Sequence, residues 1–286
     1  MATNSLERFL KKYKAERGGV HTHTRIPDTN TPETSGIWGG SYNIPDKELD
    51  KLYKYVAKKI YEDGEKEYLT ECQLNDKGPV LVDLDFRYSS EVTTRQHDAG
   101  LIDDIIDRYF EKMKMLFEID APINVYVFEK PNVNILEDKT KDGIHIIFGV
   151  TMDFVEQQIL RLEILKDFHN ITSSLPIKNG WTTEDIIDPC IPKGKTNWQM
   201  YGSRKPFNEA YQLVGAYTCN FDEDGDLEQS DIIDSLNELN KWELLKQLSA
   251  RNTEYKMFNR KPKLTKLIGE MSGLISKKKR TKRKKR

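Results

Sequence analysis

Cysteine is scarce in this chain. Its three cysteines, Cys72, Cys190 and Cys219, lie far apart in a sequence of 286 residues. Their number and spacing argue against a disulfide framework and against a zinc site of the Cys-x-x-Cys kind. We therefore expect an intracellular protein from a reducing compartment.

Long apolar runs are missing as well. No stretch approaches the ~18–20 apolar residues of a membrane span, and the opening residues MATNSLERFLKKYK lack the apolar core of a signal peptide. The chain also has no Gly-x-x-x-x-Gly-Lys-Ser/Thr phosphate loop and no cluster of cysteine and histidine. We expect neither a membrane span, nor a P-loop helicase, nor a structural zinc module in this sequence.

The net charge of −1 conceals a strong asymmetry. Nine of the 45 Lys and Arg residues fall in the last ten positions, 277–286. Without them, 36 basic residues face 46 acidic ones, so residues 1–276 carry a charge of about −10. Such a basic run repels itself, which predicts a disordered tail. The tail is either a nucleic-acid-binding arm or nuclear-import signal, or a solubilising end or linker.

Helical and strand patterns alternate along the chain. A stretch rich in Thr, Pro and Gly at residues 18–45 predicts a long loop. We predict helices at 1–17, 46–61, 101–117, 152–168 and 229–248, and strands at 67–73, 79–87, 123–130, 143–149 and 211–218. This interleaving predicts an α+β (mixed α/β) fold. We expect one domain over residues 1–260 and a basic tail or linker over residues 261–286.

Two carboxylates stand two residues apart in the apolar strand pattern Val80-Leu81-Val82-Asp83-Leu84-Asp85-Phe86. Side chains alternate across a strand, so Asp83 and Asp85 project from the same face. Adjacent carboxylates repel each other unless a positive group lies between them, and Mg²⁺ prefers oxygen ligands. The alternative is an exposed strand with two incidental acids. Nearby Glu71 and Asp76 are expected to have no role in the site.

A second feature is Gly143-Ile144-His145 in an apolar strand pattern. A lone histidine in a strand is most often a half-buried residue with its hydrogen bonds satisfied. Gly143, however, removes a side chain from the face that carries His145, which would let a ligand approach closely. The imidazole can donate a hydrogen bond to phosphate oxygens.

A third feature lies farther along the chain. Asp188 offers a possible third carboxylate, and Tyr201-Gly202-Ser203-Arg204-Lys205 combines a flexible glycine, a hydroxyl and two cations. Arginine forks onto phosphate oxygens and lysine adds a point charge, so this segment suits a triphosphate. Taken alone, it is also typical of a basic surface turn.

The order of these features resembles the archaeo-eukaryotic primase superfamily. That family is marked by a DxD motif, a small-x-His motif and a later hydrophobic-Asp motif, which here match Val82–Asp85, Gly143–His145 and Ile187-Asp188. Tyr201–Lys205 and Tyr211–Leu213 resemble the branch at the N-terminus of the primase-helicases of nucleocytoplasmic large DNA viruses. The resemblance covers roughly residues 20–220. It departs from that branch in lacking the superfamily 3 helicase that usually follows.

The resemblance implies an RRM-like catalytic sheet with helices packed behind it, joined to an N-terminal α/β unit. It implies a DNA primase or primase-polymerase that makes short primers on single-stranded DNA during viral DNA replication. Asp83, Asp85 and Asp188 would be catalytic and would bind one or two Mg²⁺ or Mn²⁺ ions. The phosphates of the incoming NTP or dNTP would be held by Gly143, His145, Ser203, Arg204 and Lys205.

The same resemblance implies partners and a location. A replicative superfamily 3 helicase would act in cis or in trans, at a viral replication site in the host cytoplasm or nucleus. A single-stranded template needs a positive groove, often with aromatic stacking. Candidates for that contact are Arg87, Arg95, Lys193, Lys195, Trp198, Arg204 and Lys205. A separate group in the early loop, His21, His23, Thr24 and Arg25, either faces a nucleotide or belongs to a disordered loop.

Two other functions stay open. In a DxD glycosyltransferase, the acidic pair would bind a metal–sugar-nucleotide complex, although Asp188 and Gly202–Lys205 would then be unexplained. In a non-catalytic nucleic-acid-binding module, the basic tail would bind and the acids would be structural.

Overall fold

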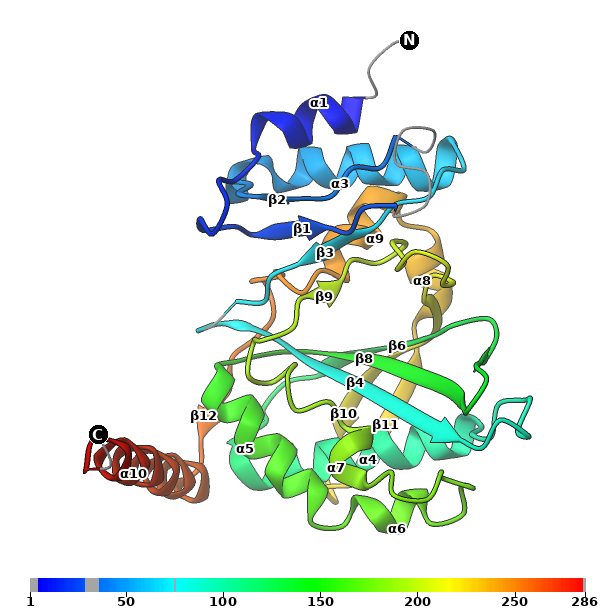
Figure 1. Ribbon diagram of the computed structural model, residues 1–286. Helices are drawn as coiled ribbons and strands as arrows, with labels where there is room; N and C mark the ends of the chain where they lie inside the picture. The colour runs from blue at the N-terminus through cyan, green and yellow to red at the C-terminus, as the bar shows by residue number, and fades with distance from the viewer. Residues whose placement is uncertain (1–4, 29–35, 75, 285–286) are drawn as a thin grey trace.

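The computed structural model describes residues 5–28, 36–74 and 76–284, with side chains up to residue 273. A larger sheet with its helices forms one part of the molecule and a smaller sheet with its own helices lies above it (Figure 1). Strands and helices are mixed in both parts, so the predicted α+β class is confirmed.

The larger sheet is antiparallel, with strand order β11–β10–β6–β8–β4 and a short strand, β7, also paired to β8. Its central strands are rich in β-branched and aromatic residues, which suit a pleated surface. The bounds are β4 (Gly78–Tyr88), β6 (Ile123–Glu129), β7 (Asn134–Ile135), β8 (Thr140–Met152), β10 (Gln212–Phe221) and β11 (Leu227–Asp231).

Helices α4 (Ala99–Leu116) and α5 (Phe154–Leu165) pack on one face of this sheet, with α6 (Phe168–Thr172) beside them. The side chains of Asp98 and Asp153 cap α4 and α5 by accepting backbone N–H groups of their first turns. Alternate strand residues, including Leu84, Phe86 and Ile144, are fully buried in the core between sheet and helices. The opposite face is therefore left to the residues that lie between them in sequence.

The smaller sheet has the strand order β2–β1–β3–β9. Its last strand comes from the second half of the chain, and so does the helix that packs on α3. The predicted N-terminal α/β unit is therefore completed by later segments. The elements are α1 (Ser5–Lys12), β1 (His23–Arg25), β2 (Gly40–Tyr42), the 3-10 turn η1 (Asp46–Glu48), α3 (Leu49–Ala57), the π-helical turn η2 (Lys58–Glu62), β3 (Leu69–Glu71), β9 (Trp198–Gln199) and α9 (Lys241–Gln247).

Buried ion pairs hold this smaller unit together. The Arg25 guanidinium donates to both carboxylate oxygens of Glu67 at 2.7 and 2.6 Å, and Lys59 donates to the same carboxylate at 3.0 Å. His23 is fully buried, 3.8 Å from Glu71. The prediction that Arg25 and His23 face a nucleotide is therefore wrong, because both side chains are enclosed by their own unit.

Residues 18–45 are not one loop. They contain β1 and β2, while residues 29–35 lie outside the described residues. β1 pairs with β2 on one side and with β3 on the other, so its hydrogen bonds depend on partners that are distant in sequence. The segment 229–248 also differs from the predicted helix, because it starts within β11 and then forms α8 (Ile233–Asn237) and α9.

The C-terminal segment folds back on the larger part. β5 (Phe117–Glu118) pairs with β12 (Asn259–Arg260), and helix α10 (Pro262–Lys284) follows. Leu264 of α10 is fully buried in the core of the larger sheet. The structure therefore differs from the prediction of a tail from residue 261, since apolar residues at helical spacing pack the first turns of α10. No helix in the described ranges is long and apolar enough to cross a membrane.

Candidate active site

The register between β4 and β8 brings the two sequence motifs together. Asp83 pairs with His145 and Asp85 pairs with Gly143 across the sheet. Paired residues of neighbouring strands point to the same face. The acids, the glycine and the histidine therefore share the face that α4 and α5 leave uncovered.

The third carboxylate lies at the outer edge of β4, the last strand in the order of the larger sheet among the described residues. The carbonyl of Asp83 accepts the N–H of Asp188 at 3.0 Å, and the carbonyl of Arg87 accepts the N–H of Lys178 at 2.7 Å. Between them, the carbonyl of Asp85 accepts the indole N–H of Trp181 at 2.8 Å. Segment 178–188, which contains α7 (Thr183–Ile186), thus docks on β4 and places Asp188 beside Asp83.

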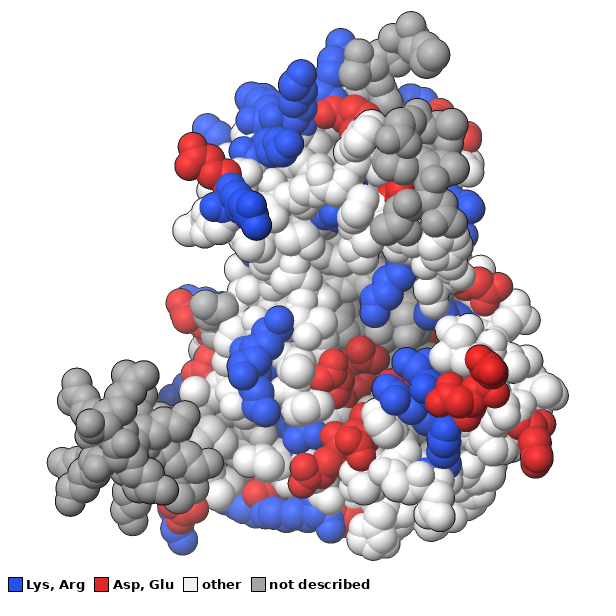
Figure 2. All heavy atoms as spheres, viewed as in Figure 1, with Lys and Arg blue, Asp and Glu red and all other residues white. Residues whose placement is uncertain are grey.

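All three carboxylates line a cleft of about 670 Å³ between the two sheets. Basic side chains surround them, and the smaller sheet contributes Thr70, Trp198 and Gln199. In Figure 2, acidic side chains gather in the hollow at the waist of this face, with basic side chains on either side. Of the predicted site residues, the cleft lining contains Asp83, Asp85, Asp188, Gly143, His145, Lys205, Arg87 and Trp198.

Asp83 is the most strongly perturbed carboxyl group of the cleft. Burial and the nearby charges of Asp188 and Asp85 raise its pKa to about 7, against the opposing effect of Lys205 and Lys130. The cations around the cleft therefore do not neutralise the acidic cluster. His145 Nε2 lies 3.5 Å from Asp83 Oδ1.

Asp85 is held by a different set of contacts. The guanidinium of Arg87 donates to Asp85 Oδ2 at 2.9 and 3.2 Å, and Lys141 lies 3.9 Å from the same oxygen. The Arg87 guanidinium stacks on the Trp181 ring at 3.6 Å. Because Trp181 also bonds the Asp85 carbonyl, the indole fixes both the strand and the cation that orients this carboxylate.

The chemistry of this donor set fits a hard divalent cation. Three carboxylates supply oxygen ligands, and burial together with the charges of Asp188 and Asp85 raises the pKa of Asp83. Asp188 Oδ1, however, accepts the N–H of Cys190 at 2.7 Å. In the described part of the chain, no three acidic, histidine or cysteine side chains converge as a ready-made metal cage. Asp188 would have to reorient for all three carboxylates to hold one ion.

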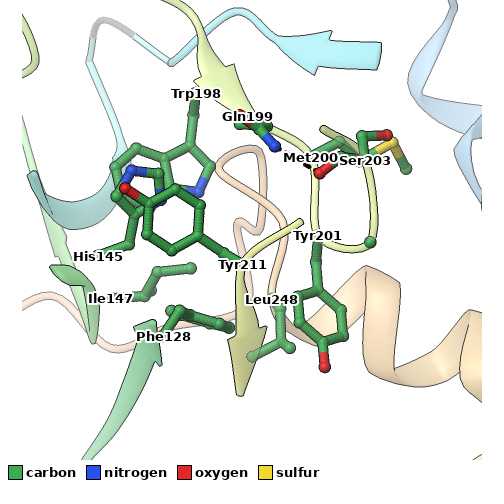
Figure 3. Close-up of a pocket in the computed structure, with 11 residues that line it drawn as sticks. Phe128, His145, Ile147, Trp198, Gln199, Met200, Tyr201, Ser203, Tyr211 and Leu248 are labelled. Atoms are coloured by element: carbon green, nitrogen blue, oxygen red, sulfur yellow. Dashed lines mark hydrogen bonds between the residues drawn. The ribbon is translucent and has the colours of Figure 1, made fainter. Parts of the chain in front are cut away.

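His145 belongs to an aromatic stack (Figure 3). Its ring lies 3.7 Å from the Tyr211 ring in a stacked arrangement and 4.3 Å from the Trp198 ring. Burial and the charges of Lys130 and Lys205 lower its pKa well below the usual range, so the imidazole is neutral at physiological pH. A neutral ring fixed in this way can donate one hydrogen bond and accept another.

Gly143 is needed for this stack, in a different way from the prediction. A Cβ atom at this position would lie 2.6 Å from the Tyr211 hydroxyl and 3.3 Å from the Leu84 carbonyl oxygen. The space that the missing side chain leaves is therefore occupied by Tyr211. Gly143 admits this tyrosine against the sheet, where it covers His145.

Family comparison agrees with this geometry. Residues 33–217, about two thirds of the chain, match the family described as C962R protein N-terminal AEP domain, in which AEP denotes archaeo-eukaryotic primase. The chain belongs to the AEP family. The matched range contains the three carboxylates and the residues that surround them. No curated protein matches this AEP domain.

Some predicted residues of the AEP domain lie away from the cleft. Ser203 is buried, and its hydroxyl has no hydrogen-bond partner among the described residues. The backbone N–H of Arg204 donates to the backbone carbonyl of Glu67, on the side of the smaller sheet. The charge of Arg204 acts on the Tyr68 hydroxyl there. Lys193 and Lys195 are exposed on the loop that follows Asp188 and do not line the cleft.

Trp198 does line the cleft, but its side chain is only 3% exposed. Its ring packs against His145, which leaves little surface for a base. Trp198 therefore supports the His145 ring. The predicted stacking of Trp198 on nucleic acid is not supported, because its ring has almost no exposed face.

Sequence reasoning missed three groups in the cleft of the AEP domain. Lys130 and Lys141 line it, and burial together with Lys205 lowers the pKa of Lys130. Tyr211 covers His145, and Trp181 anchors segment 178–188. The alternation of side chains along a strand indicated Lys141, because residues 141, 143 and 145 lie on the same face of the strand. No sequence signal placed Trp181, since its partner lies 96 residues away.

Proposed function

We propose that this AEP domain is a DNA primase or primase-polymerase that uses Mg²⁺ or Mn²⁺ to join NTPs or dNTPs into short primers on single-stranded DNA. The observation that carries the proposal is the meeting of Asp83, Asp85 and Asp188 in one cleft with several cations. A primase-type domain is what the family assignment supports in general. Metal dependence, template and product belong to the proposal.

In this mechanism, Asp83, Asp85 and Asp188 would hold the metal. When bound, the metal would supply activation of the primer 3′-hydroxyl and neutralisation of the triphosphate and leaving pyrophosphate. Lys130 and Lys205 line the same cleft as Asp83 and attract the triphosphate as point charges. Most of the rate gain would come from positioning and charge neutralisation.

His145 has a separate task in this mechanism. Its neutral imidazole is stacked on Tyr211 and supported by Trp198, so its orientation is fixed before a nucleotide arrives. It donates a hydrogen bond to a phosphate oxygen, and it lies near enough to Asp83 to sense that carboxylate's protonation. Tyr211 stacks on the ring and occupies the space that the missing side chain of Gly143 leaves.

A primer-synthesis assay tests the proposal. Labelled NTPs or dNTPs are incubated with single-stranded DNA and Mg²⁺ or Mn²⁺, and oligonucleotide products are resolved by length. We expect product from the wild type and a loss of at least about 10²-fold in the Asp83→Asn, Asp85→Asn double variant. The matched control is Asp103→Asn with Asp104→Asn, two exposed acids of α4 on the other side of the sheet.

Two results would contradict the proposal: no product with either metal, or full synthesis by the Asp83/Asp85 variant. A non-catalytic nucleic-acid-binding role is favoured by one observation, the lack of a converged metal cage in the described residues. Under that role, deletion of residues 277–286 abolishes DNA binding, and EDTA leaves binding unchanged. Under the primase proposal, the same deletion leaves synthesis dependent on Asp83 and Asp85.

We also propose that the domain works with a superfamily 3 helicase, in cis or in trans, at a viral replication site in the host cytoplasm or nucleus. The support is the resemblance of the motifs to viral primase-helicases. Co-purification of a tagged chain with such a helicase from infected cells, compared with the Asp83/Asp85 variant, measures this association apart from catalysis.

A further inference from the structure

Residues 205–208 form a tight turn at the edge of the cleft. The N–H of Asn208 donates to the carbonyl of Lys205 at 3.0 Å, and Pro206 and Phe207 occupy the two central positions. Phe207 has a φ of 63°. Positive φ after a proline is the pattern of a type II turn, which favours Gly or Asn at this place. Among the described residues, Phe207 alone combines positive φ with a side chain.

The ring of Phe207 gains no burial from this strained position. Its side chain is 76% exposed, more than any other aromatic side chain in the described ranges. A bulky residue in the left-handed region is strained, and a fold tolerates that strain where packing or function requires the residue. Packing within the chain therefore gives no reason for an aromatic side chain at this strained position.

Contacts of the two residues that follow Phe207 fix the turn beside the carboxylate cleft. Lys205 and Asn208 line the cleft, and Lys130 donates to Asn208 Oδ1 at 3.4 Å. The Glu209 carboxylate accepts the backbone and side-chain N–H groups of Asn132 at 3.0 and 2.8 Å. Phe207 therefore stands at the tip of an anchored turn, next to lysines that attract phosphate.

We propose that Phe207 is a stacking site for a base of single-stranded DNA at the entrance of the cleft. This inference rests on the proposed function, which supplies the strand. Each base has an apolar face, so an exposed ring beside cations holds a strand without reading its sequence. Lys130 and Lys205, which attract the triphosphate in the proposed function, also attract the nearest phosphate of the strand, while the ring takes an adjacent base.

Fluorescence anisotropy with two labelled oligonucleotides tests this site. One is oligodeoxythymidylate, and the other has the same length and phosphates but abasic sugars. Phe207→Asn removes the ring and keeps a residue that tolerates positive φ, whereas Phe207→Trp keeps an aromatic face. We expect Phe207→Asn to raise the Kd for the base-bearing strand about five- to thirtyfold and to leave the abasic strand unchanged. Phe207→Trp should bind like the wild type.

Thermal melting tests whether the weaker DNA affinity of Phe207→Asn comes from a loss of folding. The melting temperature of Phe207→Asn should equal or exceed that of the wild type, because the strain is relieved. Met257→Ala is the matched surface control, because Met257 is 52% exposed. Its neighbour Lys256 forms a β-bridge with Val150, and Val150 lies at the opposite end of β8 from Gly143. It should leave both affinities unchanged.

The inference is overturned if Phe207→Asn binds both strands like the wild type, or if it weakens both equally. In those cases, binding of the oligonucleotides by the wild type still supports a template role for the cleft, and only the proposed stacking on Phe207 is contradicted. If the wild type binds neither strand, the template part of the proposed function falls together with Phe207.

Discussion

At the scale of single residues, Asp83 shows how neighbouring carboxylates repel each other in the cleft. Its pKa of about 7 reflects burial and two neighbouring carboxylates. In the unfolded chain an aspartate titrates near 4. Between these two values the folded protein holds a proton that the unfolded chain has released, so the stability from this group is complete below about pH 4 and is lost as the pH rises through 7.

Asp83→Asn removes that dependence in metal-free protein. In EDTA, we expect the variant and the wild type to have similar free energies of unfolding near pH 4.5. At pH 8, the variant should be more stable by about 1–3 kcal/mol, because it no longer carries a partly buried charge beside two other carboxylates. Urea denaturation at the two pH values measures the difference.

Asp224→Asn is the control for that experiment, because Asp224 is exposed near the tip of the β10–β11 hairpin. It should change stability little at either pH. An Asp83→Asn variant whose stability relative to the wild type did not change with pH would show that Asp83 ionises normally.

The decisive feature at the scale of elements is the outer edge of β4. An edge strand presents unpaired carbonyl groups, and here segment 178–188 satisfies three of them, at Asp83, Asp85 and Arg87. The same contacts bring Asp188 to the acidic pair. The site thus depends on the register with which a mostly irregular segment docks on the strand.

Trp181 is the centre of that docking, so its substitution should loosen the segment. Trp181→Phe keeps a ring beneath Arg87 but loses the donor to Asp85, and should lower the free energy of unfolding by about 1 kcal/mol. Trp181→Ala also removes the stacked ring and should cost about 3 kcal/mol. Hydrogen exchange should become faster at the N–H groups of Lys178 and Asp188 in both variants.

Lys178→Ala provides the comparison for these variants. Its side chain bonds the carbonyl of Asp138 across the surface, while its backbone N–H is the group that pairs with β4. It should leave exchange at Asp188 unchanged. Unchanged exchange at Asp188 in Trp181→Ala would mean that segment 178–188 holds its register without the indole.

The molecule as a whole brings its cleft together from two sheets. β9 and α9 come late in the chain yet complete the smaller unit, so the chain passes between the two parts more than once (Figure 1). Glu71 strengthens this connection, because its buried carboxylate accepts the Ser249 hydroxyl and the Ala250 N–H. The expectation that Glu71 has no part in the cleft agrees with this structural role.

Truncation separates the packed part of α10 from its basic end. A chain that ends at residue 273 should keep the stability of the full chain. A chain that ends at residue 261 loses the buried Leu264 and the partly buried Leu267, Ile268 and Met271, and should be less stable by about 2–5 kcal/mol.

Leu264→Ala in the full chain should reproduce much of that loss, about 2–4 kcal/mol. Lys266→Ala is the control, because Lys266 has an exposed side chain on the same helix. Equal denaturation midpoints for chains ending at residues 261 and 273 would show that α10 does not contribute to the fold.

Much of the fold was predictable from local patterns. Leu101–Phe117 has apolar residues at helical spacing, because one face of the helix packs on a core. Residues 79–87 and 143–149 are rich in the β-branched and aromatic residues that favour strands. β1 and β2 were not predictable in this way. They are three residues each and are rich in polar side chains, so pairing with distant strands decides their structure.

The candidate site also has a part that local patterns predict and a part that only tertiary contacts decide. By itself, the sequence determined that Asp83 and Asp85 share a face, because side chains alternate in any strand. It also determined the order of the motifs that marks the AEP family. Only the tertiary structure decided that His145 lies opposite Asp83, that Asp188 joins them through Trp181, and that Tyr211 fills the space at Gly143. These contacts depend on strand register and loop docking between residues far apart in sequence, which local periodicity does not encode.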